Sequence, residues 1–524
     1  MGTAISLRIV LAIGAFVLPV GAGIEDPVHI DAGPISGVPG AIHGVRVFRG
    51  IPFALPPVGG LRWRAPQSVV AWQGVRRADR FSKICMQRPH EKGSYYQMEF
   101  YREPEESSED CLYLNVWTPA RSAEEKLPVL VWIHGGGFAQ GSGSTPSQSG
   151  EGLARKGVVV VTFNYRLGVF GLLAHPELSK ESQRHTSGNY ALMDQIAALR
   201  WVQRNIRAFG GDAQRVTVFG QSAGSNSIVL LMTSPEARGL FQRAAGASAF
   251  LGGEGAASRN LASLREAEEK GVELGRKLKA HSLAALRDRS ADELLQASDR
   301  QFRPIVDGYV VPEDPYQVLL EARQTKIPVL LGSNSNERGN YPQPHNAAEY
   351  LDFTRRQYPA AAESAMQMFP AVGGKVVEAY LRRERDRTAD GMYKWAELMT
   401  RAGTPAYLYY FGRVPPARPG ETPLGAVHTA EIVYFRNLLD TVERPWAQQD
   451  RELADTMSSY LVNFVATGNP NSNRLPKWPV YKAGEVMELG DHIGPIPTPD
   501  ARELQWFEEY FAREQQAQQS KSVR

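Results

Sequence analysis

The sequence predicts an α/β protein in which a mostly parallel central sheet is covered by helices on both faces. Short, almost continuously apolar runs recur along the 524 residues, and a helical pattern separates two of them. Continuous apolar strands are typical of parallel sheets that are buried on both faces. The order strand, helix, strand favours a right-handed crossover between neighbouring parallel strands.

Five apolar runs are predicted as buried strands. They are residues 128–134 (PVLVWIH), 157–163 (GVVVVTF), 216–220 (VTVFG), 327–332 (IPVLLG) and 406–411 (AYLYYF).

The segment between the second and third runs predicts a helix over residues 189–209. Its apolar positions are Leu192, Ile196, Leu199, Val202 and Ile206, which step by three or four residues and share one helical face. Gly210 and Gly211 then supply a helix stop.

The remaining segments predict additions to this sheet. Residues 33–66 are rich in Gly and Pro and predict irregular or antiparallel structure. Residues 254–300 and 346–402 have helical spacing and predict helical insertions, and a last amphipathic helix is expected over about residues 500–518. We therefore expect one domain over residues 24–515, followed by a polar tail at 516–524.

The N-terminus resembles a secretory signal. One positive charge at Arg8 precedes an apolar run at residues 9–20, and small residues follow at 21–23. A buried N-terminal strand or helix is the alternative. The apolar run is short for a bilayer crossing, and no later stretch reaches that length. We expect a signal peptide at 1–23 and an exported protein, periplasmic or secreted, without stable membrane insertion.

Charge and cysteine content narrow the class of protein further. The chain has 59 basic and 56 acidic residues and a net charge of +3, without a basic patch interleaved with aromatic residues. Nucleic acid is therefore not an expected partner. Cys85 and Cys111 are the two cysteines, and in an exported chain such a pair predicts one disulfide, whereas a cytosolic chain would keep free thiols.

The segment 220–224 (GQSAG) has the pattern of a nucleophile elbow. It follows the predicted strand 216–220 and precedes an apolar run at 228–232 that can continue as a helix. A sharp strand-to-helix turn holds the serine exposed, and glycines on both sides relieve crowding of the backbone. Ser222 is therefore the candidate nucleophile, and a serine that only caps a helix is the alternative.

The segment 134–138 (HGGGF) follows the first predicted strand. Its glycines leave backbone N–H groups uncovered, and such donors stabilise the oxyanion of an acyl-transfer intermediate. A loop of this type commonly accompanies the elbow. A flexible turn is the alternative.

A serine nucleophile needs a base and an acid, which the residues alone do not single out. In proteins with this elbow the base follows the acid in the chain. The candidate bases are His281, His345, His428 and His492, and His428 follows the strand 406–411. The candidate acids are Glu337, Asp307 and Glu431.

From about residue 33 to 510 the chain resembles the type-B carboxylesterases, the family of cholinesterases and bacterial para-nitrobenzyl esterases within the α/β-hydrolase superfamily. The resemblance rests on two signature stretches, FGG…V-V-GQSAG at 209–224 and EDCLYLNV at 109–116. Further similar runs are FRGIPFALPPVGGLRW at 48–63, NYRLGVFGLLAHPEL at 164–178 and GNYALMDQ at 188–195.

The resemblance implies an α/β-hydrolase fold and a serine carboxylesterase that forms an acyl-enzyme, without a metal ion or organic cofactor. It implies that Ser222, Glu337 and His428 form the catalytic triad. The residues implied for the oxyanion hole are Gly136, Gly137 and Ala223. The pair implied for the family's first disulfide is Cys85 and Cys111, and the structural ion pair implied beside it is Arg62 with Glu109.

Two positions depart from the family pattern. Gln221 stands where many eukaryotic members have Glu, so a cationic substrate loses one electrostatic partner. Arg338 stands where the family usually has Gly directly after the acid, which predicts a different loop after Glu337.

A small-molecule ester is the expected substrate. A related amide, carbamate or lactone bond is an alternative, as is a non-catalytic adhesion or binding protein of the same fold. The aromatic residues Phe138, Phe250 and Tyr341 are candidates for lining the substrate pockets, with a purely structural core role as the alternative.

Overall fold

The computed structural model describes residues 24–100, 105–249, 261–298, 302–498 and 501–522. The predicted signal peptide at 1–23, the candidate pocket residue Phe250 and the first part of the insertion predicted at 254–300 lie outside these ranges.

An eleven-stranded mixed sheet forms the centre of the described chain. The strands from β10 to β15 in spatial order are mutually parallel, and antiparallel strands extend both edges. In spatial order they are β16 (Ile493–Pro497), β15 (Glu485–Leu489), β14 (Ala406–Phe411), β13 (Val329–Asn334), β12 (Arg243–Ala247), β11 (Gly211–Gln221), β9 (Leu127–Ile133), β10 (Val159–Phe163), β8 (Tyr113–Thr118), β4 (Arg46–Pro52) and β3 (Val38–Pro39).

All five predicted apolar runs are strands, β9, β10, β11, β13 and β14, although β11 begins at Gly211 rather than at residue 216. The segment 33–66 contains β4, which pairs antiparallel with β8. The apolar-run criterion misses β12, whose sequence is RAAGA. Small residues are required there, because a Cβ on Gly246 would lie 2.6 Å from Ser225 Oγ and 2.7 Å from the Trp395 ring.

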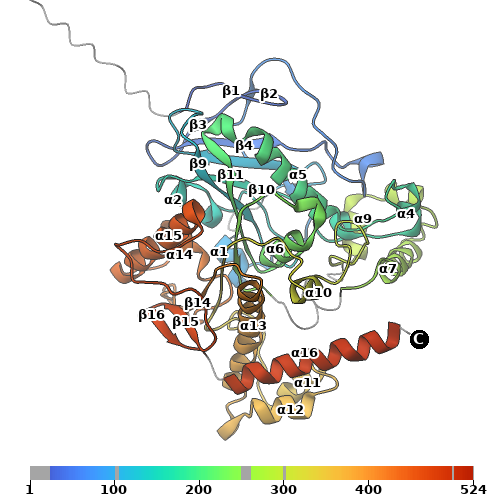
Figure 1. The fold of residues 1–524 in the computed structure, drawn as a ribbon. Helices are drawn as coiled ribbons and strands as arrows, with labels where there is room; N and C mark the ends of the chain where they lie inside the picture. Colours follow the sequence, from blue (N-terminus) through green and yellow to red (C-terminus); the bar gives the residue numbers. More distant parts are fainter. Residues whose placement is uncertain (1–23, 101–104, 250–260, 299–301, 499–500, 523–524) are drawn as a thin grey trace, which may run out of the picture.

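Helices cover both faces of the sheet, as Figure 1 shows. On β9, Val129, Val131 and Ile133 join the core cluster that also contains residues of α5 (Tyr190–Asn205), α6 (Ala223–Thr233) and α13 (Val376–Arg401). Leu130 and Trp132 point the other way, into the cluster that contains α14 (Ile432–Phe435) and α15 (Gln448–Thr467). This alternation along one apolar strand is the reason that the sheet has two cores.

The predicted helix over 189–209 is α5 followed by a 3₁₀ turn, η3 (Ile206–Phe209). Gly210 ends it in the left-handed conformation with φ 75°.

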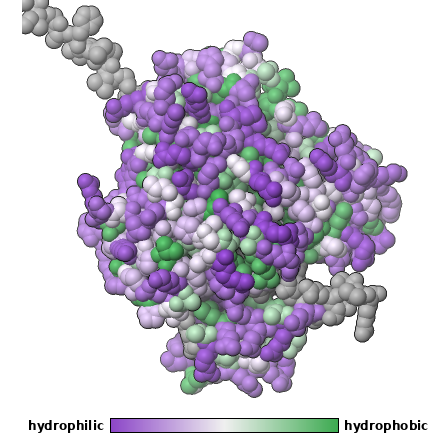
Figure 2. All heavy atoms as spheres, in the orientation of Figure 1, coloured by the Kyte–Doolittle hydropathy of each residue, from purple (hydrophilic) through white to green (hydrophobic). Residues whose placement is uncertain are grey.

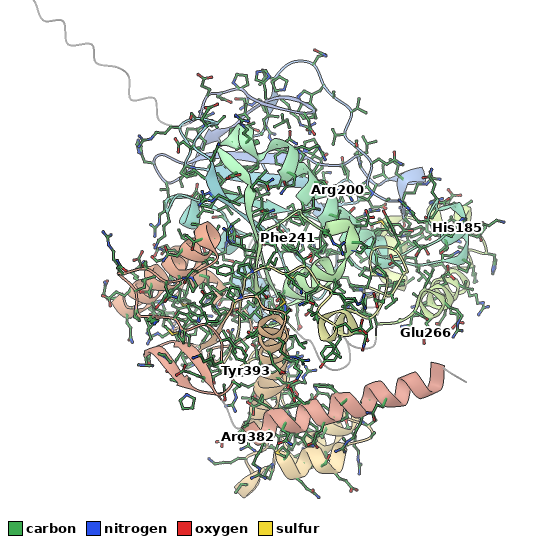
Figure 3. All side chains as sticks on the ribbon, viewed as in Figure 1. His185, Arg200, Phe241, Glu266, Arg382 and Tyr393 are labelled. Atoms are coloured by element: carbon green, nitrogen blue, oxygen red, sulfur yellow. A yellow bond between two sulfur atoms is a disulfide. The ribbon has the colours of Figure 1, made fainter. Side chains whose placement is uncertain are left out.

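Further helices lie at the periphery. Residues 264–297 contain α7 (Leu264–Lys277), α8 (Leu283–Arg287) and α9 (Ala291–Ala297). Glu266 and Ser263 form a capping box that begins α7, and Figure 3 shows Glu266 at the edge of the molecule.

The helices α11 (Ala347–Gln357), α12 (Ala362–Met368) and α16 (Ala501–Ser522) gather at one end of α13 (Figure 1). They enclose an aromatic cluster that includes Tyr358, Phe369 and Phe507. Figure 2 shows a mostly hydrophilic face with apolar residues in small groups. In the part of the chain that the structure describes, no helix combines the length and apolar character that a bilayer crossing needs.

One disulfide and one ion pair hold the segment before β8. Cys85 and Cys111 form a disulfide. Arg62 binds the carboxylate of Glu109 through two hydrogen bonds, one of them 2.7 Å from Nε to Oε2. Arg62 Nη1 also donates to the carbonyls of Arg287 and Arg289, at 2.8 and 2.6 Å, so Arg62 links the segment after β4 to the end of α8.

Replacement of both Cys85 and Cys111 by Ala should lower the free energy of unfolding by about 3–4 kcal/mol, because the bond closes a loop of 26 residues in sequence separation. Urea denaturation of the oxidised wild type and of the variant measures the difference. Reduction of the wild type with a thiol should give the same loss, and an unchanged midpoint in both would contradict a structural role for the bond.

Candidate active site

Ser222 sits in the sharp turn between β11 and α6, with φ 55° and ψ −122°. The two flanking glycines are required by close packing. A Cβ on Gly220 would lie 2.4 Å from the carbonyl carbon of Gly224, and one on Gly224 would lie 2.0 Å from the carbonyl oxygen of Ile133. Ser222 is partly exposed while Gln221 and Ala223 are buried. The sequence pattern at 220–224 therefore corresponds to a strained turn that presents a serine.

The glycine loop after β9 runs directly beside this serine. A Cβ on Gly135 would lie 3.2 Å from Ser222 Cβ. Gly136 and Gly137 are exposed, and among the described residues their N–H groups donate to no protein acceptor. Ala223, at the first position of α6, adds a third N–H at a helix N-terminus. The residues expected to form the oxyanion hole therefore lie in the two segments that meet at Ser222.

His134 holds this loop through the carbonyl group of Gly135. Its Nδ1 lies 2.9 Å from the carbonyl oxygen of Gly135, and its ring stacks on Tyr165 with 4.2 Å between the ring centroids. Burial, opposed by the bond to Gly135, lowers the pKa of His134 to about 4. The ring is therefore neutral near pH 7, and its Nδ1–H donates to the carbonyl.

The structure brings His428 and Glu337 together. His428 Nδ1 lies 2.5 Å from Glu337 Oε2, and both side chains are buried. The two residues come from the loops after β14 and β13, and a β-bridge between Asn336 and Val427 joins these loops. Because parallel strands end at the same edge of the sheet, these loops meet the elbow after β11 and the glycine loop after β9.

Glu337 is held as a carboxylate. Its Oε1 accepts hydrogen bonds from the N–H of Asn334 and the hydroxyl of Ser248, both at 2.8 Å. Burial acts to raise the pKa of Glu337, but His428 and these two donors act against it, and the pKa lies below its usual value. An ionised carboxylate at His428 Nδ1 fixes the proton on that nitrogen and leaves Nε2 as the proton acceptor.

The other candidate bases are placed elsewhere. His281, His345 and His492 are all exposed, and His492 pairs with Glu488 through Nδ1 at 3.2 Å. Asp307 lies in a buried turn, where its Oδ1 accepts the N–H groups of Tyr309 and Val311.

Glu431, the third candidate acid, lies near Glu337 but bonds another group. Its Oε2 accepts the side-chain amide of Asn334 at 2.5 Å, and within the described chain its buried Oε1 has no partner. Burial and the nearby charge of Glu337 raise the pKa of Glu431 to about 8. Glu431 is therefore a neutral carboxylic acid near pH 7, packed behind the Glu337–His428 pair.

The two departures from the family pattern have distinct contacts. The Gln221 amide Nε2 lies 3.0 Å from His428 Nε2, where it donates to the unprotonated ring nitrogen. The Arg338 guanidinium lies 4.5 Å from the centre of the Tyr341 ring and 3.6 Å from the Glu384 carboxylate. Arg338 therefore points away from the acid's hydrogen bonds and toward α13.

The expected pocket residues divide as follows. Phe138 is 2% exposed and belongs to the core cluster, which favours the structural role for it. Tyr341 is partly buried and its hydroxyl lies 2.7 Å from that of Tyr96.

Sequence reasoning missed the supporting roles of His134, Ser248 and Asn334, since nothing in their local patterns indicates a contact with a distant loop. Within the described ranges no group of three or more His, Cys, Asp or Glu side chains is arranged to hold a metal ion.

The model of the carboxylesterase family matches residues 25–391 and 387–501, which is most of the chain. The protein belongs to the carboxylesterase family.

Relatives of this carboxylesterase include the fumonisin B1 esterase of Sphingopyxis macrogoltabida, 39% identical over 92% of this chain and 90% of that protein. The para-nitrobenzyl esterase of Bacillus subtilis (strain 168) is 35% identical over 88% and 95% of the two chains. A solved structure of a PNB esterase superposes with a TM-score of 0.77 at 31% identity, over 92% of this chain and 99% of that one. The carboxylesterase EST55 of Geobacillus stearothermophilus gives the same values. The fold is that of the α/β-hydrolases, and the protein is a carboxylic ester hydrolase.

The raised pKa of Glu431 makes the stability of the carboxylesterase depend on pH. In the unfolded chain Glu431 ionises near its ordinary value of 4.5, whereas in the folded chain it stays protonated up to about 8. The free energy of unfolding therefore falls as the pH rises from about 5 to 8, because over this range only the unfolded state releases the proton. Glu431→Gln, a neutral replacement of the same shape, should remove this loss.

The free energy of unfolding of Glu431→Gln should match the wild type near pH 5 and exceed it by on the order of 2–4 kcal/mol at pH 8. Urea denaturation at the two pH values measures this difference. A difference that does not grow with pH would contradict a buried neutral acid at this position.

Proposed function

We propose that this carboxylic ester hydrolase works through an acyl-enzyme on Ser222, with His428 as general base and Glu337 as its orienting acid. The observation that carries the proposal is the buried bond between His428 Nδ1 and Glu337 Oε2, beside a serine held in a strained elbow. A serine hydroxyl is a weak nucleophile near neutral pH, and a paired imidazole supplies the missing base.

In the first half-reaction, Ser222 Oγ attacks the ester carbonyl carbon while its proton moves to His428 Nε2. The carbonyl oxygen becomes an oxyanion that accepts from the N–H groups of Gly136, Gly137 and Ala223. The intermediate collapses, the C–O bond to the alcohol breaks, and His428 returns the proton to the leaving oxygen. Water then repeats these steps on the acyl-enzyme, which releases the carboxylic acid and restores Ser222.

Gln221 is the hydrogen-bond partner of His428 Nε2 before the reaction begins. Its amide Nε2 donates to His428 Nε2, so the Ser222 hydroxyl has to replace this donor before proton transfer. A neutral amide there adds no negative charge, which favours neutral over cationic alcohol groups in the substrate.

We propose short aryl and alkyl esters as substrates. The names of the relatives, a para-nitrobenzyl esterase and a fumonisin B1 esterase, support esters over amide, carbamate or lactone bonds. A non-catalytic binding role is disfavoured, because the chain has a candidate nucleophile, base and acid. A panel that varies acyl length and alcohol size, and includes fumonisin B1, would rank the substrates by kcat/KM.

We propose that the protein is exported and that residues 1–23 are removed. The charged, apolar and small-residue order at 1–23 supports this, as does the Cys85–Cys111 disulfide, which persists in oxidising compartments. N-terminal sequencing of protein from the periplasm or medium tests it, and an intact Met1 would contradict it.

Ser222→Ala should lower kcat for para-nitrophenyl acetate by at least about 10⁴-fold, because the acyl-enzyme cannot form. Ser225→Ala is the matched control, since Ser225 lies in α6 directly after the elbow and has a buried hydroxyl with no partner among the described residues. Equal rates for Ser222→Ala and wild type would remove the proposed nucleophile.

Glu337→Gln should lower kcat by about 10⁴-fold, because an amide no longer stabilises the imidazolium and can hold the wrong tautomer. Glu431→Gln, a replacement of the same chemistry at the neighbouring buried acid, should stay within about threefold of wild type. Steady-state kinetics with para-nitrophenyl acetate at pH 7 compares the two. If Glu431→Gln is the inactive variant, the acid is Glu431 instead.

A further inference from the structure

Arg303 contacts the glycine loop from a distant part of the chain. Its Nη1 donates to the carbonyl oxygen of Gly137 at 2.9 Å and to that of Phe302 at 3.2 Å. Gly137 is one of the residues proposed for the oxyanion hole. No motif in the sequence draws attention to Arg303.

The direction of each N–H group in the glycine loop depends on the carbonyl of the preceding residue. In a trans peptide the C=O of one residue and the N–H of the next point in opposite directions. The Gly135 carbonyl is bound by the His134 ring, and the Gly136 carbonyl accepts the N–H groups of Ala139 and Gln140. The Gly137 carbonyl is bound by Arg303. These anchors fix the N–H directions of Gly136, Gly137 and Phe138.

The loop needs such anchors because its backbone is not in a locally preferred conformation. Gly136, Gly137 and Phe138 have φ of 100°, 64° and 57°, three left-handed residues in succession. Phe138, which is not a glycine, costs on the order of 1 kcal/mol in that region. The Phe138 carbonyl is held by the N–H of Gly168 at 2.7 Å. Arg303 binds the Gly137 carbonyl, which lies between the Gly136 and Phe138 carbonyls that backbone N–H groups hold.

The charge of Arg303 acts on the same peptide. A guanidinium remains protonated throughout the working pH range. Beside the Gly137 carbonyl, it polarises the loop and contributes a positive potential next to the site where negative charge develops. Such an effect is greater in the transition state than in the neutral ester, so it acts on kcat more than on KM.

The segment that carries Arg303 has its own support. Phe302 and Ile305 are buried, at 5% and 3% exposure. The backbone of Ile305 is bound on both sides by Asn189, at 3.0 Å to its N–H and 2.8 Å to its carbonyl. Removal of the guanidinium should therefore leave this segment in place.

We propose that Arg303 is a positioning residue of the oxyanion loop. It holds the backbone of Gly137 by its carbonyl, one peptide beyond the Gly137 N–H that is proposed to face the oxyanion, and stabilises the developing oxyanion by its charge. This inference rests on the proposed acyl-enzyme function and concerns the same site.

The test compares Arg303→Met, which keeps the length of the side chain, with Arg303→Lys, which keeps the charge. Arg215→Met is the matched control, because Arg215 also donates to two backbone carbonyls, those of Lys126 and Ala466. Arg215 lies in β11 and Lys126 directly precedes β9, so this contact is at the end of the strands away from the glycine loop. For para-nitrophenyl acetate, Arg303→Met should lower kcat about 10- to 100-fold with KM within about threefold. This is less than the roughly 10²–10³-fold cost of a lost oxyanion donor, because Arg303 acts through the loop backbone. Arg303→Lys should recover part of this loss, and Arg215→Met should retain the wild-type kcat.

A second readout isolates the oxyanion. Ser222 Oγ adds to the carbonyl carbon of a trifluoromethyl ketone while its proton moves to His428, and the carbonyl oxygen becomes a tetrahedral oxyanion. The inhibition constant of this ketone should therefore rise in Arg303→Met by the same factor by which kcat/KM falls. An unchanged kcat, a change in KM alone, or an unchanged inhibition constant would each overturn the inference. Failure of the proposed function would appear instead in the wild type, as no ester turnover or as full activity of Ser222→Ala.

Discussion

The hydrogen bond between His428 and Glu337 is the interaction on which the rest of the site depends. A carboxylate that is fully removed from water is strongly destabilised unless hydrogen bonds or charges compensate for the lost solvation. Glu337 receives three such bonds, from His428, Asn334 and Ser248. Each donor lies at the carboxyl end of a strand or in the loop that follows one, at the same edge of the sheet, so the requirement to satisfy one buried carboxylate determines how these segments meet.

Glu431 shows the complementary consequence of the same constraint. Two carboxylates so close together cannot both be ionised cheaply in a buried site. Glu337 takes the charge because it has the donors, and Glu431 keeps its proton. Neighbouring acids of the same residue type therefore differ in charge state through their partners alone, and only the ionised acid can orient an imidazole for proton transfer.

The glycine loop obeys a second constraint, which is geometric. Its free N–H groups can face the nucleophile only if the carbonyls on the other side of each peptide find partners behind the loop. His134 and the N–H groups of Ala139 and Gln140 are those partners, and Arg303 binds the next carbonyl of the loop, that of Gly137. The structure thus separates an active face of donors from an anchored face of acceptors.

Much of this arrangement could be predicted from local sequence, and the part that could not be has a physical reason. Apolar runs revealed β9, β10, β11, β13 and β14, because strands buried on both faces need continuous apolar residues. The strand β12 could not be predicted in this way, because packing against Trp395 requires small residues there. The elbow is local in sequence and could be predicted. The pairing of Glu337 with His428 spans 91 residues, and the contact of Arg303 with Gly137 spans 166, so neither leaves a local pattern.

The most direct measurement of the central claim is NMR spectroscopy of the ¹⁵N-histidine-labelled protein, with His428 assigned by comparison with His428→Gln. A short bond from His428 Nδ1–H to an ionised Glu337 predicts a proton resonance on Nδ1 far downfield of the other histidine protons. In Glu337→Gln this resonance should move upfield by several parts per million or disappear. The absence of a downfield Nδ1 proton in the wild type, or its persistence unchanged in Glu337→Gln, would contradict the account.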